Sequence, residues 1–163
     1  MQQPYLTAYQ QIPADGSVLD IGCLGFQHVA IAQQLGLTDL RHAGVDFVES
    51  NAPLPEGFEF RKADLNQEPL PFADDRFDLV VASHVIEHLR DPVAFFGECV
   101  RVCKPGGLIY VAAPSERSLL LPGMPFEHHK FTASRSLMIR PIWHGPGRHR
   151  HSIGSPATIA VSP

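Results

Sequence analysis

The chain has 163 residues, 44% of them hydrophobic, which suits one compact domain with a substantial core. All 17 acidic residues lie at or before Glu127, together with only eight of the 13 basic residues. This acidic body excludes a broad nucleic-acid footprint, which needs clustered lysines and arginines. We therefore expect a small molecule, and no nucleic acid, as the partner.

The sequence also indicates the cellular compartment in which the protein is expected. No cationic segment followed by an apolar run opens the chain, and no stretch approaches the roughly 20 apolar residues of a membrane span. The three cysteines, Cys23, Cys99 and Cys103, lack the dense spacing of a disulfide scaffold, so we expect thiols packed among apolar side chains. The prediction is a cytoplasmic protein without membrane attachment.

The residue pattern in the first half of the sequence predicts three strands and one helix. Residues 17–21 form a short apolar run that ends in a glycine turn, and residues 26–35 follow with apolar side chains near helical spacing. Residues 41–47 and 58–65 are two further strand candidates. Between them, residues 51–57 contain two prolines and a glycine, so the usual crossover helix should be short or absent.

The second half predicts a strand, a helix and another strand. Residues 77–83 form a near-continuous apolar run, typical of a strand buried on both faces of a parallel sheet. Asp91 and Pro92 form a helix start, and the Lys-Pro-Gly-Gly at residues 104–107 ends the helix before a strand at residues 108–113. The apolar positions expected to face the core are Val93, Phe96, Val100 and Cys103.

Alternating strands and helices indicate an α/β fold with a doubly wound parallel sheet. From Pro114 the pattern weakens, and after Leu137 the composition becomes rich in Gly, Pro, His and Arg. We predict a domain over residues 1–139 and an irregular or disordered basic tail over residues 140–163.

Glycines and acidic residues cluster where the predicted strands end. Asp20, Gly22, Cys23 and Gly25 follow the first strand, where glycines let a ligand approach the backbone, although a tight turn alone also uses glycine. Asp46 ends the second strand, where a carboxylate is placed to bind ribose hydroxyls or serves only as a solvated turn residue.

A third acidic strand end is Asp64, with Leu65 beside it. An aspartate accepts hydrogen bonds from an adenine amine, and an adjacent apolar side chain packs against the ring. Three acidic strand ends in succession favour an adenosine-containing ligand over chance.

Four segments carry a resemblance to a known family. Residues 18–23 (Val-Leu-Asp-Ile-Gly-Cys), 70–80, 83–92 and 101–107 together resemble class I S-adenosylmethionine-dependent methyltransferases. The similarity is greatest to the small-molecule type that includes the ubiquinone and menaquinone biosynthesis enzymes. It implies a Rossmann-like, mostly parallel sheet of order 3-2-1-4-5, S-adenosylmethionine as cofactor, and methyl transfer to a small-molecule nucleophile.

The resemblance also assigns site residues. It implies that Asp20 and Gly22 lie under the methionine moiety, that Asp46 holds the ribose, and that Ser83 lies beside the cofactor through its backbone. Asp64 and Leu65 would meet the adenine. The full predicted cofactor-binding set is Asp20, Gly22, Cys23, Gly25, Asp46, Phe47, Asp64, Leu65 and Ser83.

Two histidines are the predicted catalytic residues. Because the sulfonium makes the methyl carbon electrophilic, the protein needs only to align a nucleophile and exclude water. His84 or His88 would act as a general base for a hydroxyl substrate. In the alternative interpretation, His88 packs as a helix residue and His84 is a partly buried neighbour of the cofactor.

The sequence departs from the family pattern in two places. Leu24 and Phe26 stand where glycines are usual, and we expect these bulky side chains to narrow the turn. The antiparallel hairpin that normally follows the fifth strand is missing from the predicted elements, as in a C-terminally truncated member. Residues 108–113 would then form an exposed edge, through which a homodimer could pair.

The sequence leaves two other functions and a metal site to consider. A non-catalytic cofactor-binding or interaction module is favoured by Leu24 and Phe26. A nicotinamide-dependent oxidoreductase needs a Gly-x-Gly-x-x-Gly turn that the sequence lacks. A metal site is not predicted, since no structural zinc spacing occurs among His128, His129, His144, His149 and His151. A lid over the acceptor is expected in residues 1–13 or 119–131.

Overall fold

The computed structural model describes residues 4–114, 134–139 and 160–161, and these residues form an α/β sandwich. The sheet has seven strands in the order β3-β2-β1-β4-β5-β6-β7. They are β1 (Ser17–Ile21), β2 (Arg41–Asp46), β3 (Glu59–Lys62), β4 (Phe77–Ser83), β5 (Cys103–Pro114), β6 (Ser134–Ile139) and β7 (Ala160–Val161). The helices are α1 (Pro4–Tyr9), α2 (Gln27–Gln34) and α3 (Pro92–Val102), with a 3-10 turn, η1 (Ile86–His88).

The predicted α/β class and the order 3-2-1-4-5 are confirmed, because β1 to β5 are all parallel in that order. The expected exposed edge on β5 is wrong. Six residues of β6 pair antiparallel along β5, from Ile109 with Ile139 to Pro114 with Ser134, and β7 pairs antiparallel with β6. A homodimer through a free β5 edge therefore has no basis in this fold.

The predicted tail and lid segments fall mostly beyond what the structure covers. Residues 140–159 and 162–163 lie outside the described residues, as do the predicted lid segment 119–131 and all five histidines weighed as metal ligands. Residues 160 and 161 form β7. Between β2 and β3 the described chain contains no helix, as the prolines there predicted.

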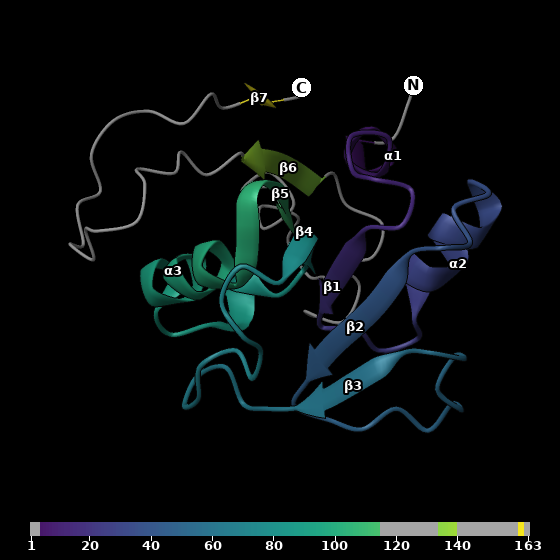
Figure 1. Cartoon of the computed structure of the whole chain (residues 1–163). Helices are drawn as coiled ribbons and strands as arrows, with labels where there is room; N and C mark the ends of the chain where they lie inside the picture. The colour runs from purple at the N-terminus through teal and green to yellow at the C-terminus, as the bar shows by residue number, and fades with distance from the viewer. Residues whose placement is uncertain (1–3, 115–133, 140–159, 162–163) are drawn as a thin grey trace, which may run out of the picture.

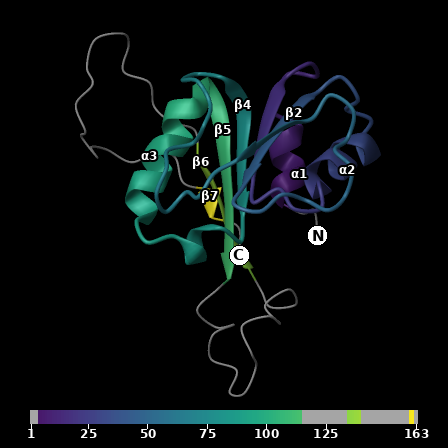
Figure 2. The same ribbon diagram turned by 90° about the horizontal axis from the view of Figure 1, so that it is seen from below.

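Each face of the sheet has its own core (Figures 1 and 2). One face packs against α3, and Phe95, Cys99 and Val102 of that helix join buried residues of β1, β4 and β5. The other face packs against α1 and α2 through Tyr9 and Ala32. Strands buried on both sides explain the continuous apolar runs of β1 and β4.

The start of α3 follows its sequence signal, but its buried face follows the predicted stripe only in part. Asp91 Oδ1 accepts a hydrogen bond from Ala94 N at 2.9 Å, and Pro92 opens the helix. Of the predicted stripe, Cys103 is buried and Phe96 packs half-buried against the core, whereas Val93 and Val100 are exposed. The helix buries Phe95, Cys99 and Val102 instead of the two valines. The helix also ends at Val102, one residue earlier than predicted, because Cys103 already pairs with Phe77 as part of β5.

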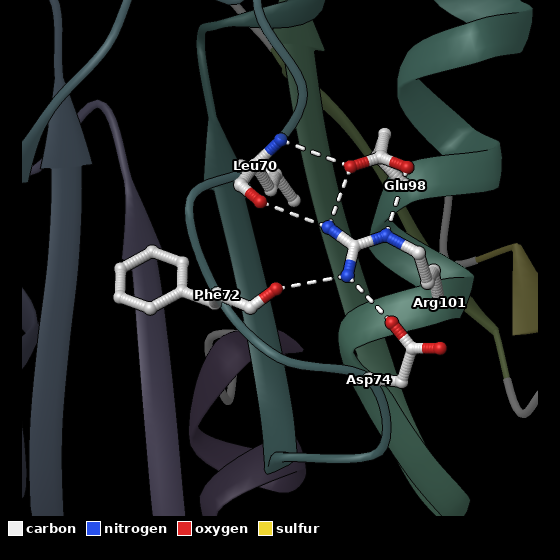
Figure 3. A network of polar contacts seen from close by, with 5 residues as sticks. All are labelled: Leu70, Phe72, Asp74, Glu98 and Arg101. Carbon is white, nitrogen blue, oxygen red and sulfur yellow. Dashed lines mark hydrogen bonds and ion pairs between the residues drawn. The ribbon is translucent and has the colours of Figure 1, made fainter.

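Arg101 explains why α3 adopts this rotation (Figure 3). Its guanidinium donates to the carbonyls of Leu70 and Phe72, both at 2.8 Å, and to the carboxylates of Glu98 and Asp74, at 2.7–2.9 Å. Glu98 also accepts from Leu70 N at 2.9 Å. This Arg101 network fixes the loop before β4 against α3.

The amino ends of the central strands are fastened by Asp78. Its Oδ2 accepts hydrogen bonds from the backbone N and the Oγ of Ser17 and from Lys104 Nζ, each at 2.8 Å. One carboxylate therefore joins β1, β4 and β5 at the edge of the sheet opposite to the predicted site.

No described helix is long and apolar enough to cross a membrane.

Candidate functional site

The predicted site residues gather at the carboxyl ends of four adjacent strands. Asp20 lies next to the end of β1, Asp46 and Ser83 are the last residues of β2 and β4, and Asp64 follows β3 by two residues. Since these strands are parallel neighbours, their ends form one edge of the sheet. In open α/β sheets this edge is where ligands bind.

Asp20 is a buried carboxyl group without a counter-ion. Only 4% of the residue is exposed, and its side chain has no hydrogen-bond or ionic partner among the described residues. Burial, together with the nearby Asp46 carboxylate, raises the pKa of Asp20 to about 8. Burying a carboxyl group without a partner costs free energy, so this arrangement favours a ligand that is cationic or that donates a hydrogen bond.

The turn after β1 requires glycine at one position. Gly22 has φ of +78°, and a Cβ there would lie 2.7 Å from Val85 Cγ2 in the segment after β4. Its amide donates to the Val45 carbonyl at 2.9 Å. A side chain at residue 22 would therefore crowd the Val85 side chain, and the positive φ adds to the preference for glycine. Gly25 also has positive φ, with open space where its Cβ would be.

Phe26 does not narrow the turn as expected. Its backbone is left-handed, with φ of +51°, and its side chain is buried against Cys23 and Phe58. The Phe26 and Phe58 ring centres lie 5.0 Å apart, edge to face. Leu24, by contrast, is 47% exposed at the turn. Cys23, which is also predicted as a cofactor contact, packs its side chain in this buried cluster.

Asp46 and Phe47 present different groups to the edge. The Asp46 carboxyl is buried, and its Oδ1 accepts from Val48 N at 3.1 Å. Phe47 is 69% exposed, which leaves an aromatic surface beside that carboxylate. This pairing of a held carboxylate and a free ring suits a ligand with hydroxyls next to a flat group.

Asp64 shapes its own loop. Its Oδ1 accepts from Asn66 N at 3.0 Å and its Oδ2 from Gln67 Nε2 at 2.6 Å. These bonds, the first of them to the Asn66 backbone, hold the pKa of Asp64 below its usual range. Leu65 packs half-buried against the core. A carboxylate has about four acceptor sites, so Asp64 retains capacity for a ligand donor.

The segment after β4 holds the two predicted bases. His84 has a left-handed backbone, with φ of +57°, and its amide donates to the Ala112 carbonyl at 2.8 Å. Its Nδ1 lies 3.5 Å from Glu87 Oε1. His88 is exposed at the end of η1. The structure thus brings His84 to the strand end beside Ser83 and leaves His88 further along the segment.

Sequence reasoning missed Asn66. Its Oδ1 accepts from Arg90 N at 2.8 Å and its Nδ2 donates to the His88 carbonyl at 3.3 Å. A single side chain therefore joins the loop after β3 to the segment after β4. The only signal in the sequence was an amide residue two positions after Asp64.

A buried pair on the other side of the site was also missed. The Tyr9 hydroxyl donates to the His28 carbonyl at 3.2 Å and lies 3.1 Å from His28 Nδ1. Burial lowers the pKa of His28 to about 4, and burial followed by the Asp20 charge raises that of Tyr9. The pair anchors α1 to the start of α2, near Asp20.

A surface hollow of about 350 Å³ lies elsewhere, among the first residues of the strands, including Ser17, Arg41, Glu59 and Phe77. It is at the opposite edge of the sheet, and Arg76 and Lys104 in its wall are paired with Glu59 and Asp78. No group of three or more potential metal ligands occurs in the described part of the chain. The strand-end residues therefore remain the candidate site.

The sequence profile of one known family matches this arrangement. The family described as "Methyltransferase domain" matches residues 19–111, which span β1 to β5 and every predicted site residue. The chain belongs to this family.

Curated relatives of this methyltransferase-domain chain carry consistent names. A ubiquinone biosynthesis O-methyltransferase of Dinoroseobacter shibae is 34% identical over 98 residues, 56% of this chain and 38% of that protein. A protein of Mycobacterium tuberculosis, named a probable S-adenosylmethionine-dependent methyltransferase, is 34% identical over 149 residues, 79% of this chain and 52% of its own length. The chain spans about half, or less, of the length of the curated relatives it matches.

Solved structures share the fold. A protein of Pyrococcus horikoshii superposes with a TM-score of 0.54 at 28% identity, covering 72% of this chain and 53% of that one. A SAM dependent methyltransferase from Aquifex aeolicus gives a TM-score of 0.57 over 78% of this chain and 71% of its own, at 17% identity. The second likeness concerns the fold alone.

Proposed function

We propose that this chain binds S-adenosylmethionine at the carboxyl ends of β1 to β4 and transfers its methyl group to a small-molecule nucleophile. The observation that carries the proposal is the buried, unpartnered carboxyl of Asp20 beside that of Asp46. Membership of the methyltransferase family and the names of the relatives support it.

The residues fit the proposed cofactor. Asp20 offers an unsatisfied acceptor to a positively charged methionine moiety, and Gly22 lets that moiety approach the backbone. Asp46 would hold the ribose hydroxyls, while Asp64 and Leu65 would face the adenine. When bound, S-adenosylmethionine supplies an electrophilic methyl carbon.

The acceptor side is assigned to the segment after β4. His84 is the better placed base, because it adjoins Ser83 at the strand end and Glu87 lies within 3.5 Å of its ring. A carboxylate near an imidazole stabilises the protonated form that general-base catalysis produces. His88 is the second candidate. The remaining work of the chain is to align the nucleophile and exclude water.

The O-methyltransferase name of one relative supports an oxygen nucleophile on a small molecule, although it describes that protein. We extend the proposal to a small-molecule acceptor, with no nucleic acid partner, in the cytoplasm. The acidic composition of residues 1–127 favours this class over a phosphate-backbone ligand.

Calorimetric titration with S-adenosylmethionine and S-adenosylhomocysteine tests the proposal. We expect micromolar binding by the unaltered chain and at least a tenfold weaker affinity for Asp46→Ala, because the ribose loses its acceptor. Asp39→Ala, which removes an exposed turn carboxylate, is the matched control and should bind normally. A folded chain that binds neither compound would refute the proposal.

The second function to test is a cofactor-binding module without turnover. Leu24 favours it, because an exposed leucine occupies the turn where the family pattern has glycine. Incubation with radiolabelled S-adenosylmethionine and a panel of phenolic and amine acceptors separates the two. Methylated product lost in His84→Ala, with cofactor affinity unchanged, supports catalysis; binding without product from any acceptor supports the module.

A further inference from the structure

Asn66 stands between the two halves of the proposed site. Its backbone amide donates to Asp64 Oδ1 at 3.0 Å, on the proposed adenine side. Its side chain bonds to Arg90 N and to the His88 carbonyl, on the proposed acceptor side. Within the described residues, these are the hydrogen bonds that join the two loops directly.

The chemistry of the contact selects an amide side chain. Arg90 N needs an acceptor and the carbonyl of His88 needs a donor, and a carboxamide offers both from one planar group whatever the pH. An aspartate at this position would keep the bond to Arg90 N but would place an oxygen against the His88 carbonyl. The contact therefore depends on residue type and not only on filling space.

The hydrogen bonds of Asn66 lie where they can hold the segment that carries the two candidate bases. Arg90 immediately precedes Asp91, which caps α3, and His88 ends η1. The segment from His84 to Arg90 is thus held at one end by the His84 amide bond to Ala112 and at the other by Asn66. Without Asn66, the second end would keep only the start of α3 and the packing of Leu89 against the core.

We propose that Asn66 is a positioning residue that ties the Asp64 loop to residues 84–90, so that a ligand bound at Asp64 also orders the segment carrying His84 and His88. This inference rests on the proposed function, since it assumes that the ligand reaches Asp64. It assigns no contact between Asn66 and the ligand.

Residue-resolved amide exchange measured by NMR, with and without S-adenosylhomocysteine, tests whether Asn66 couples the Asp64 loop to residues 84–90. In the unaltered chain, the ligand should slow exchange of the amides in residues 64–67 and also in residues 84–90. In Asn66→Ala, the slowing at residues 64–67 should persist, whereas the slowing at residues 84–90 should fall by about fivefold, the equivalent of one lost hydrogen bond. Asn66→Asp should retain part of the effect at Arg90.

The controls separate positioning from stability. Gln34→Ala, which removes an exposed amide on α2, should behave as the unaltered chain. A merely structural role for Asn66 would speed exchange at residues 84–90 equally with and without ligand. Undiminished ligand-dependent slowing in Asn66→Ala would overturn the inference and leave the proposed function intact. Absence of S-adenosylhomocysteine binding to the unaltered chain would overturn both.

Discussion

The two halves of the sheet are built by different means. In the half containing β1, β2 and β3, one eight-residue helix starts from a left-handed Phe26, and no helix connects β2 to β3 among the described residues. In the half containing β4 and β5, an eleven-residue helix has an aspartate cap, a proline start and the Arg101 network. Site residues come from both halves.

This contrast teaches where precision in the site originates. The first half supplies carboxylates on turns whose shape depends on glycines and on one strained phenylalanine. The second half supplies a segment fixed at both ends by hydrogen bonds. We therefore expect the second half to resist disturbance until its polar network is cut, and the first half to respond to changes in backbone freedom.

The largest expected effect is in the second half. Arg101→Ala should lower the free energy of unfolding by about 4 kcal/mol, because Glu98 and the carbonyls of Leu70 and Phe72 lose charge-assisted bonds. Urea denaturation measures this loss. Arg61→Ala is the control: its ion pair with Glu59 is exposed, so the change should stay below about 0.5 kcal/mol. A loss under 1 kcal/mol for Arg101→Ala would contradict the contrast.

The first half is tested by two substitutions at one residue. Phe26→Ala should cost about 3 kcal/mol, since it removes a buried ring packed on Phe58 and keeps the left-handed strain. Phe26→Gly removes the same ring but relieves the strain, so it should cost about 1 kcal/mol less. Thermal and urea unfolding of both variants give the difference. The reverse order would mean that the backbone at residue 26 stores no strain.

The smallest effect concerns Asp20 and appears as a pH dependence. The folded-state pKa of about 8 lies above the unfolded value near 3.8, so the folded chain binds more protons between these values and stability falls as pH rises. Asp20→Asn removes this dependence. Its stability relative to the unaltered chain should rise by about 2 kcal/mol between pH 6.5 and 8.

The window for that measurement is set by His28. Its pKa of about 4 in the folded chain lies below the ordinary 6.5, so between these values His28 changes stability in the opposite direction, with stability lost as pH falls. Above pH 6.5 this contribution fades, and because His28 and His42, whose pKa burial also lowers, are unchanged in Asp20→Asn, their effect cancels in the difference between the two chains. An unchanged gap between Asp20→Asn and the unaltered chain from pH 6.5 to 8 would show that Asp20 is not buried uncharged.

The strands followed from the sequence because burial on both faces demands continuous apolar runs, whereas their order was implied by the resemblance to the methyltransferase family. The strand predicted at residues 77–83 matches β4 residue for residue. The face of α3 did not follow, since Val93 and Val100 are as apolar as Phe95 and Val102, and periodicity alone does not choose between two apolar stripes. Arg101 determines which side of α3 is buried, through its contacts with residues about 30 positions away.

The site was predictable in its acidic strand ends and not in its connections. Asp20, Asp46 and Asp64 follow apolar runs, so their common edge is a consequence of parallel topology. The left-handed backbone of Phe26 has no residue signature, because this conformation normally selects glycine, asparagine, aspartate or histidine. The side-chain bridge of Asn66 spans 24 positions and depends on the relative placement of two loops.

The central place of β1 has a consequence for synthesis on the ribosome. Its partners are β2, which follows closely, and β4, whose Leu79 pairs with Val18 across 61 positions of sequence. At roughly 5–20 residues per second, the nascent chain carries β1 for roughly 3–12 s with one edge open. Throughout that interval the unpaired edge of β1 is open to pairing with neighbouring chains.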